Sequence, residues 1–76
     1  MKKLYLHAVV IKKTMELNDA MKKVKEITKR TKVPYMRETE DSFRFRNIPK
    51  TRFDPTSFRT KKINDQISLI FGHLRD

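Results

Sequence analysis

Residues 42–48, Ser-Phe-Arg-Phe-Arg-Asn-Ile, alternate apolar and basic side chains, and they decide the fold class of this chain. Alternation with a period of two is typical of a strand that buries one face and exposes the other. Phe43 and Phe45 are therefore expected in a core, with Arg44 and Arg46 on the outer face. The pattern predicts a half-buried β-strand with a basic surface.

A second strand is predicted earlier in the chain, at residues 3–11. Both alternating sets of side chains in this segment are mostly apolar. Such a pattern favours a central strand that is covered on both faces, or covered on one face and paired at the other. His7 lies within the segment, and we interpret it as a hydrogen-bonded core or edge residue.

Residues 15–31 predict the one helix of the fold. Asn18 or Thr14 can cap its start with a side-chain oxygen, and Pro34 prevents its continuation. The residues that recur at helical spacing and form the inward stripe are Leu17, Ala20, Met21, Val24, Ile27 and Thr28.

The remaining segments complete an α+β fold. Residues 35–41 hold an acidic cluster and predict a turn or an irregular strand, and Phe53 is the apolar anchor of the connection that follows. Residues 57–63 and 67–73 predict a hairpin in which Gly72 marks a bulge or the strand end. The Asn-Asp-Gln link at 64–66 predicts a short turn, since Asn and Asp tolerate left-handed backbone. We expect one domain over residues 1–76: a small antiparallel sheet of about four strands, with one helix packed on one face, in the order β-α-β-β-β.

The composition points to an anionic partner. Nineteen Lys and Arg stand against nine Asp and Glu, for a net charge of +10, and such self-repulsion is relieved by a bound anion. No cysteine is present, which excludes a disulfide framework and a thiolate zinc site. The single glycine excludes a glycine-rich phosphate loop, and we expect no cofactor. No apolar run has the length of a membrane span or a secretory signal, so we expect a cytoplasmic protein with no membrane partner.

Basic side chains on two predicted strands, on a loop and on the helix form the candidate binding site. Guanidinium groups offer paired planar donors that suit phosphate oxygens, and no acid interrupts residues 42–53. If the strands that carry them are neighbours, their cations form one continuous patch, although an ordinary solvated face is the alternative interpretation. The residues predicted to contact nucleic acid are Arg44, Arg46, Arg52, Arg59, Lys61, Lys22, Lys25 and Lys29.

Two other chemistries are compatible with parts of the sequence. The phenylalanines could stack on bases, but their alternation with arginine favours the core, which leaves Tyr35 as the aromatic residue expected to be most exposed. The acidic residues of the 38–41 segment, with His7 or His73, could hold Mg²⁺ in a small nuclease. No matching acid lies elsewhere at a recognisable spacing, so we expect neither a metal site nor catalysis.

One segment of the chain resembles a known group of sequences. Residues 44–74 contain Arg-x-Arg, a proline, a phenylalanine, then Ser57-Phe58-Arg59-Thr60, and finally an apolar strand ending at Gly72. This pattern resembles small uncharacterised proteins of phages and prophages, except that Thr56 stands where that group usually has glycine. The resemblance implies a viral or mobile-element source and carries no established activity.

Taken together, these features predict a small basic phage-type protein that binds DNA or RNA through the phosphate backbone, without catalysis, in the cytoplasm of a host cell. The alternative is a viral inhibitor or adaptor that binds an acidic surface of a host protein or ribonucleoprotein complex. Self-association is also compatible with the sequence.

Overall fold

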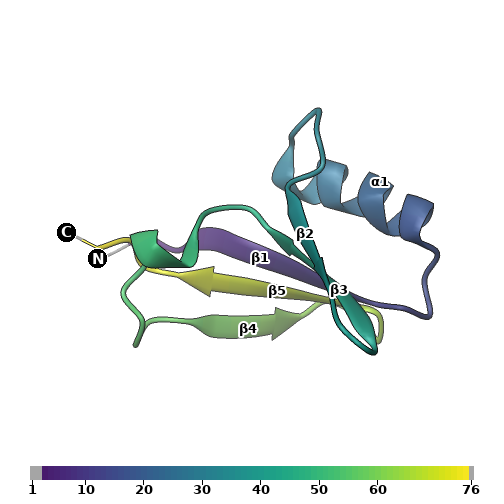
Figure 1. The fold of residues 1–76 in the computed structure, drawn as a ribbon. Coiled ribbons are helices and arrows are strands. Elements are labelled where there is room, and N and C mark those ends of the chain that lie inside the picture. The colour runs from purple at the N-terminus through teal and green to yellow at the C-terminus, as the bar shows by residue number, and fades with distance from the viewer. Residues whose placement is uncertain (1–2, 76) are drawn as a thin grey trace.

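Residues 3–75 fold into one antiparallel sheet with one α-helix on one of its faces, which confirms the α+β class (Figure 1). The computed structural model describes residues 3–75. Its elements, in chain order, are β1 (Tyr5–Lys12), α1 (Leu17–Thr28), β2 (Tyr35–Glu38), β3 (Ser42–Arg46), the 3-10 turn η1 (Lys50–Arg52), β4 (Arg59–Lys62) and β5 (Ile67–Gly72).

The sheet has five strands in the order β2-β3-β1-β5-β4, one strand more than expected. The additional strand is β2, within the segment predicted as a turn or an irregular strand. Only Met36 of its four residues is half-buried, so its alternation gives little apolar signal. β1 lies in the middle and pairs with β3 and β5, which confirms the prediction of a central strand.

The strand registers divide the side chains between two faces, because directly paired residues in antiparallel strands point to the same side. One row faces α1 and runs Met36, Phe45, Val9, Leu69 and Lys61. The next row faces away from α1 and runs Arg37, Arg44, Val10, Ser68 and Lys62. We call this second side the open face.

The main core lies between α1 and the sheet. Phe45 and Val9 from the sheet and Val24 from the helix are fully buried, and Phe43 joins the same cluster. The predicted division of β3 into inward phenylalanines and outward arginines is therefore confirmed.

The helix α1 is shorter than the predicted 15–31. A turn precedes it, in which the Met15 N–H donates to the Lys12 carbonyl oxygen over 3.1 Å, and Glu16 is the capping residue. No side chain caps this end, so the predicted roles of Asn18 and Thr14 were wrong. At the other end Lys29 adopts a left-handed conformation with φ of 56°, which ends the helix. Within residues 3–75 no helix is long and apolar enough to cross a membrane.

A smaller aromatic cluster packs at one end of the open face, away from α1. The rings of His7, Phe53 and Phe58 lie with centroids 5.1 to 5.4 Å apart, and Phe53 is fully buried, as its predicted anchoring role requires. Gly72 ends β5 below this cluster, at the strand end that the sequence predicted. A Cβ atom there would lie 2.8 Å from Cδ1 of Phe53, so glycine is required for close packing.

The β4–β5 hairpin confirms the predicted pairing of the last two strands. Its turn depends on Asn64, whose Oδ1 accepts hydrogen bonds from the N–H groups of Gln66 (2.8 Å) and Ile67 (2.9 Å). The predicted short turn at residues 64–66 is confirmed, and it forms without left-handed backbone, since Lys29 is the one residue with positive φ in the part of the chain that the structure describes.

Candidate nucleic-acid interface

The site begins with a bulge in β1 at His7. The register between β1 and β5 shifts between Leu6 and Ala8, which allows the His7 ring to pack on the open face. The His7 carbonyl oxygen accepts hydrogen bonds from the N–H groups of Asn47 (2.7 Å) and Ile48 (3.3 Å). In return, Nδ1–H of His7 donates to the Ile48 carbonyl oxygen over 2.7 Å. The loop that follows β3 is thereby fixed beside the open face.

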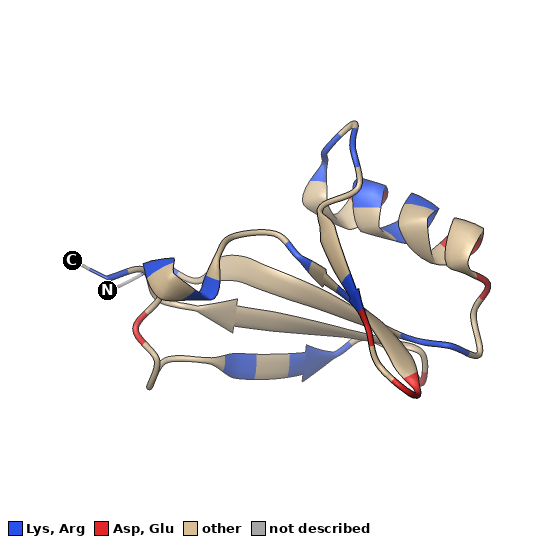
Figure 2. Ribbon diagram, in the orientation of Figure 1, with Lys and Arg blue, Asp and Glu red and all other residues tan. Residues whose placement is uncertain are grey.

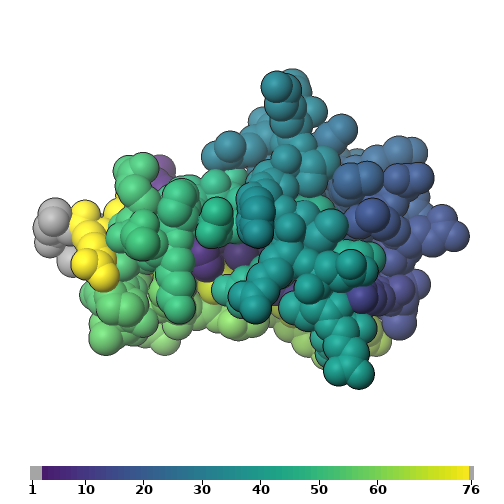
Figure 3. Space-filling model, viewed as in Figure 1, coloured from purple at the N-terminus to yellow at the C-terminus, as the bar shows by residue number. Residues whose placement is uncertain are grey.

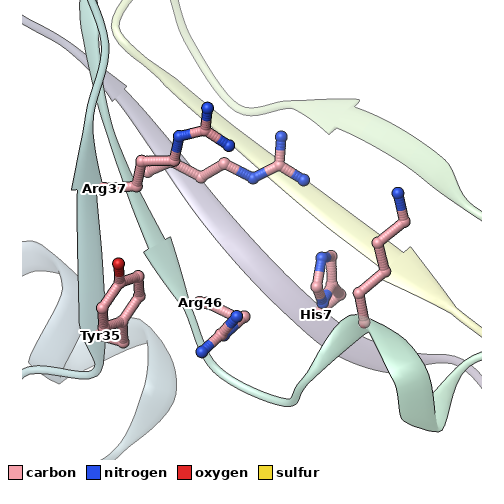
Figure 4. Close-up of a pocket in the computed structure, with 6 residues that line it drawn as sticks. His7, Tyr35, Arg37 and Arg46 are labelled. Carbon is pink, nitrogen blue, oxygen red and sulfur yellow. The ribbon is translucent and has the colours of Figure 1, made fainter.

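A cavity of about 200 Å³ opens between this loop and the β2–β3 hairpin. Figure 3 shows the hollow, with β1 visible at its floor, and Figure 4 shows the side chains around it. It continues towards β4 along Phe58, Thr60 and Ile70. We call this surface the basic groove, and its main cavity is lined by His7, Tyr35, Arg37, Arg44, Arg46 and Lys50.

The positive charge of the groove is not neutralised by its own chain. Among residues 3–75 the cations Arg37, Arg44, Arg46 and Lys50 form no ion pair with a carboxylate. Glu38 follows Arg37 in β2 but points to the helix side, where it pairs with Lys13 at 3.0 Å. Figure 2 shows acidic residues gathered at the turn between β2 and β3, at the far end of the hairpin from the groove. The groove therefore presents four free cations to an incoming anion.

An exposed aromatic ring flanks these cations. Tyr35 is 65% exposed, which confirms its predicted exposure, and the guanidinium carbon of Arg46 lies 4.8 Å from its ring centroid. This arrangement is a cation–π contact, which orients the Arg46 fork beside the phenol. Tyr35 and Arg46 are directly paired across β2 and β3, so the strand register holds both on the same side.

His7 forms the floor of the groove, and it is only 2% exposed. Burial lowers the pKa of His7 below 6.5, and the nearby charges of Arg44, Arg46 and Lys50 lower it further, against the hydrogen bond to Ile48, which raises it. The imidazole is therefore neutral at pH 7. Because Nδ1 carries the proton donated to Ile48, Nε2 is a bare acceptor.

The predicted continuous patch of Arg44, Arg46, Arg59 and Lys61 was wrong. Two strands, β1 and β5, separate β3 from β4. Arg59 is paired with Phe71 and Lys61 with Leu69, so both point to the helix side of the sheet, whereas Arg44 and Arg46 line the groove on the open face.

The other predicted contact residues also lie outside the groove. Arg52 is exposed on η1, where its carbonyl oxygen accepts the Arg75 N–H over 2.9 Å. The three helix lysines Lys22, Lys25 and Lys29 are exposed on α1 and its C-terminal cap, which cover the opposite face of the sheet. These lysines were predicted to belong to the same binding surface as the strand arginines, and the fold places them on the other face of the sheet.

Sequence reasoning missed His7, Tyr35 and Arg37 as groove residues. A signal for two of them exists in residues 35–38, Tyr-Met-Arg-Glu, whose alternation puts Tyr35 and Arg37 on one side of a strand. The bulge that turns His7 to the open face has no comparable signal. The acidic cluster of residues 38–41 forms no metal site, since no group of three potential ligands converges anywhere in residues 3–75.

Comparisons of this chain with models of protein families, with curated proteins and with solved structures find no match, so its fold and groove stand on the geometry alone.

Proposed function

We propose that this protein binds nucleic acid through the phosphate backbone, as a non-catalytic module, with the basic groove as its contact surface. One observation carries the proposal: four cations from β2, β3 and η1 converge on one cavity without a carboxylate partner among residues 3–75. Phosphate oxygens supply the missing negative charge, and three of the four cations are guanidinium forks suited to them.

The groove also explains why recognition would be tolerant of sequence. Backbone phosphates are the same at every nucleotide, and contacts to them fix position without reading bases. α1 lies on the far face of the sheet, so the groove itself is built from strands and a loop. A host-cell location and a phage source follow from the sequence resemblance and belong to the same proposal.

The first test is the salt dependence of binding to a mixed-sequence oligonucleotide, measured by fluorescence anisotropy. If all four groove cations contact phosphates, log K falls against log salt with a slope of about −3.6 on duplex and about −2.8 on single strands. A flat response, or no binding at low salt, contradicts the proposal.

The second test separates the groove from bulk charge with a matched pair of variants. Arg44→Gln/Arg46→Gln and Arg59→Gln/Lys61→Gln each remove two charges, but from opposite faces of the same sheet. We expect the first variant to reduce the salt slope by about two units. The second should leave the slope close to that of the unmodified chain. Equal reductions of the salt slope in both variants would mean that the groove acts only through its contribution to the net charge.

A further inference from the structure

The groove has two features that a phosphate backbone alone does not use. Tyr35 is 65% exposed although it is aromatic, and Arg46 fixes it at the rim of the cavity. A second planar group has room to stack on this phenol. Every base offers a π-face, so stacking of this kind is independent of sequence.

The other feature is the recessed floor. The His7 ring, only 2% exposed, lines the cavity together with Arg44 and Arg46 of β3 and Lys50 of η1. Its Nδ1–H is engaged with the Ile48 carbonyl oxygen, and no hydrogen bond to Nε2 is formed by any residue in the 3–75 range. The side chain is thus almost fully buried and yet has one acceptor nitrogen available, which takes an N–H or O–H group of a ligand and not a phosphate oxygen.

A duplex cannot use either of these features. Its bases are already paired and stacked inside the helix, so they cannot reach Tyr35, whereas unpaired bases can be splayed out and stacked on aromatic side chains. A single strand is also flexible enough to lower one phosphate between the β2–β3 hairpin and the loop at residues 47–50, where Figure 3 shows the hollow.

We propose that the basic groove takes single-stranded nucleic acid, with one phosphodiester held by Arg44, Arg46 and Lys50, and the adjoining base stacked on Tyr35. This inference rests on the proposed function and narrows its ligand. Single-stranded DNA and single-stranded RNA share the required chemistry, and oligothymidylate and oligouridylate are the probes that distinguish them.

The experiment measures anisotropy with four labelled probes of ten nucleotides: oligothymidylate, oligouridylate, a duplex of mixed sequence, and an abasic strand with the same phosphates. Tyr35→Leu removes the ring from an exposed position, and Tyr35→Phe retains it. Tyr5→Leu is the matched control, because Tyr5 is also exposed and carries Lys3 at 5.7 Å from its ring centroid, outside the groove.

We expect oligothymidylate to bind more tightly than the duplex, and Tyr35→Leu to weaken oligothymidylate binding about tenfold. Tyr35→Phe and Tyr5→Leu should bind it like the unmodified protein, and Tyr35→Leu should not change binding of the abasic strand. Circular dichroism of Tyr35→Leu checks that the sheet is intact.

Two results overturn the inference and leave the proposed function standing: a duplex that binds as tightly as oligothymidylate, or a Tyr35→Leu variant that binds oligothymidylate as well as Tyr5→Leu does. Absence of salt-dependent binding to every one of the four probes overturns the proposed function itself, together with the inference.

Discussion

β3 and β4 each carry two basic side chains at alternate positions, yet Arg44 and Arg46 lie on the open face whereas Arg59 and Lys61 lie on the helix side. In β3, Phe45 enters the main core below α1, so Arg44 turns to the open face. Before β4, Phe58 packs against the His7 ring on the open face, so Arg59 turns to the helix side. The side of a strand on which a charge lies is therefore decided by where the neighbouring aromatic ring is buried.

The difference also separates a site from a charged surface. The cations of β3 face Arg37 of β2 and Lys50 of η1 across a cavity. Those of β4 lie at the edge of the sheet, where Arg59 and Lys61 flank a more apolar hollow with Leu4 and Phe71. The two pairs of cations therefore have different surroundings, and substitutions in both regions test how far the contrast extends.

The largest effect is expected from the two aromatic rings that set the contrast. Phe45→Ala should lower the free energy of unfolding by about 3–5 kcal/mol, because the ring is fully buried, and this is comparable with the whole stability of so small a domain. Phe58→Ala, at a half-buried position, should cost about 1–2 kcal/mol. Urea denaturation followed by circular dichroism gives both values, and equal losses would show that the aromatic cluster stabilises the fold as much as the main core does.

Gly72→Ala should cost about 1–3 kcal/mol by overpacking the aromatic cluster that orients β4. Its new Cβ would lie 2.8 Å from Cδ1 of Phe53, whose ring is fully buried and cannot turn away. Phe53→Leu in the same chain should recover part of this loss, measured against Phe53→Leu alone in the same denaturation experiment. Strictly additive losses would exclude a clash with Phe53 as the cause.

Arg37→Glu should raise the free energy of unfolding by about 0.2–1 kcal/mol, because Arg37 lies directly opposite Arg44 and like charges in that position repel. Lys61→Glu, directly opposite Leu69, should change stability less. The same Arg37→Glu variant should bind oligonucleotides more weakly, since it removes a groove cation. Denaturation and anisotropy on one preparation check both effects. A destabilised Arg37→Glu variant would show that repulsion between Arg37 and Arg44 does not lower the stability of the folded chain.

The smallest effect concerns the titration of His7. Arg44 and Arg46 lower the pKa of His7, in addition to its burial, so Arg44→Gln/Arg46→Gln should raise that pKa, while Arg59→Gln/Lys61→Gln should leave it unchanged. NMR titration of the His7 Cε1–H resonance, assigned with His7→Gln, measures the shift. If both variants shifted the pKa of His7 equally, the cations on the two faces of the sheet would influence this pKa to the same extent.

The lowered pKa also fixes the sign of a stability change. The unfolded chain binds a proton at His7 more readily than the folded one, so this group contributes its full stability above about pH 6.5 and loses it as the pH falls towards the folded-state pKa. Thermal melts at stepped pH should show this decline in the unmodified chain and a smaller one in His7→Gln.

Local patterns predicted most of the elements but not their arrangement. The alternation of residues 42–46 and the apolar stripe around Val24 were sufficient to predict β3 and α1, because each depends on neighbours within a few residues. That β3 and β4 are not neighbours depends on long-range pairing with β1 and β5, which no local period contains. Arg44 and Arg46 were therefore predicted correctly as outward-facing cations. His7, Tyr35 and Arg37 were not predicted as residues of the same groove.

The position of β1 in the middle of the sheet has a consequence for how the chain folds. The hairpins β2–β3 and β4–β5 join strands close in sequence, and each can form early. β1 precedes both of its partners, and it is paired on both sides only after β5, which begins at Ile67, has docked. Loop closure over that separation slows folding, so an apolar strand with an unpaired edge persists during folding and is open to association with other chains.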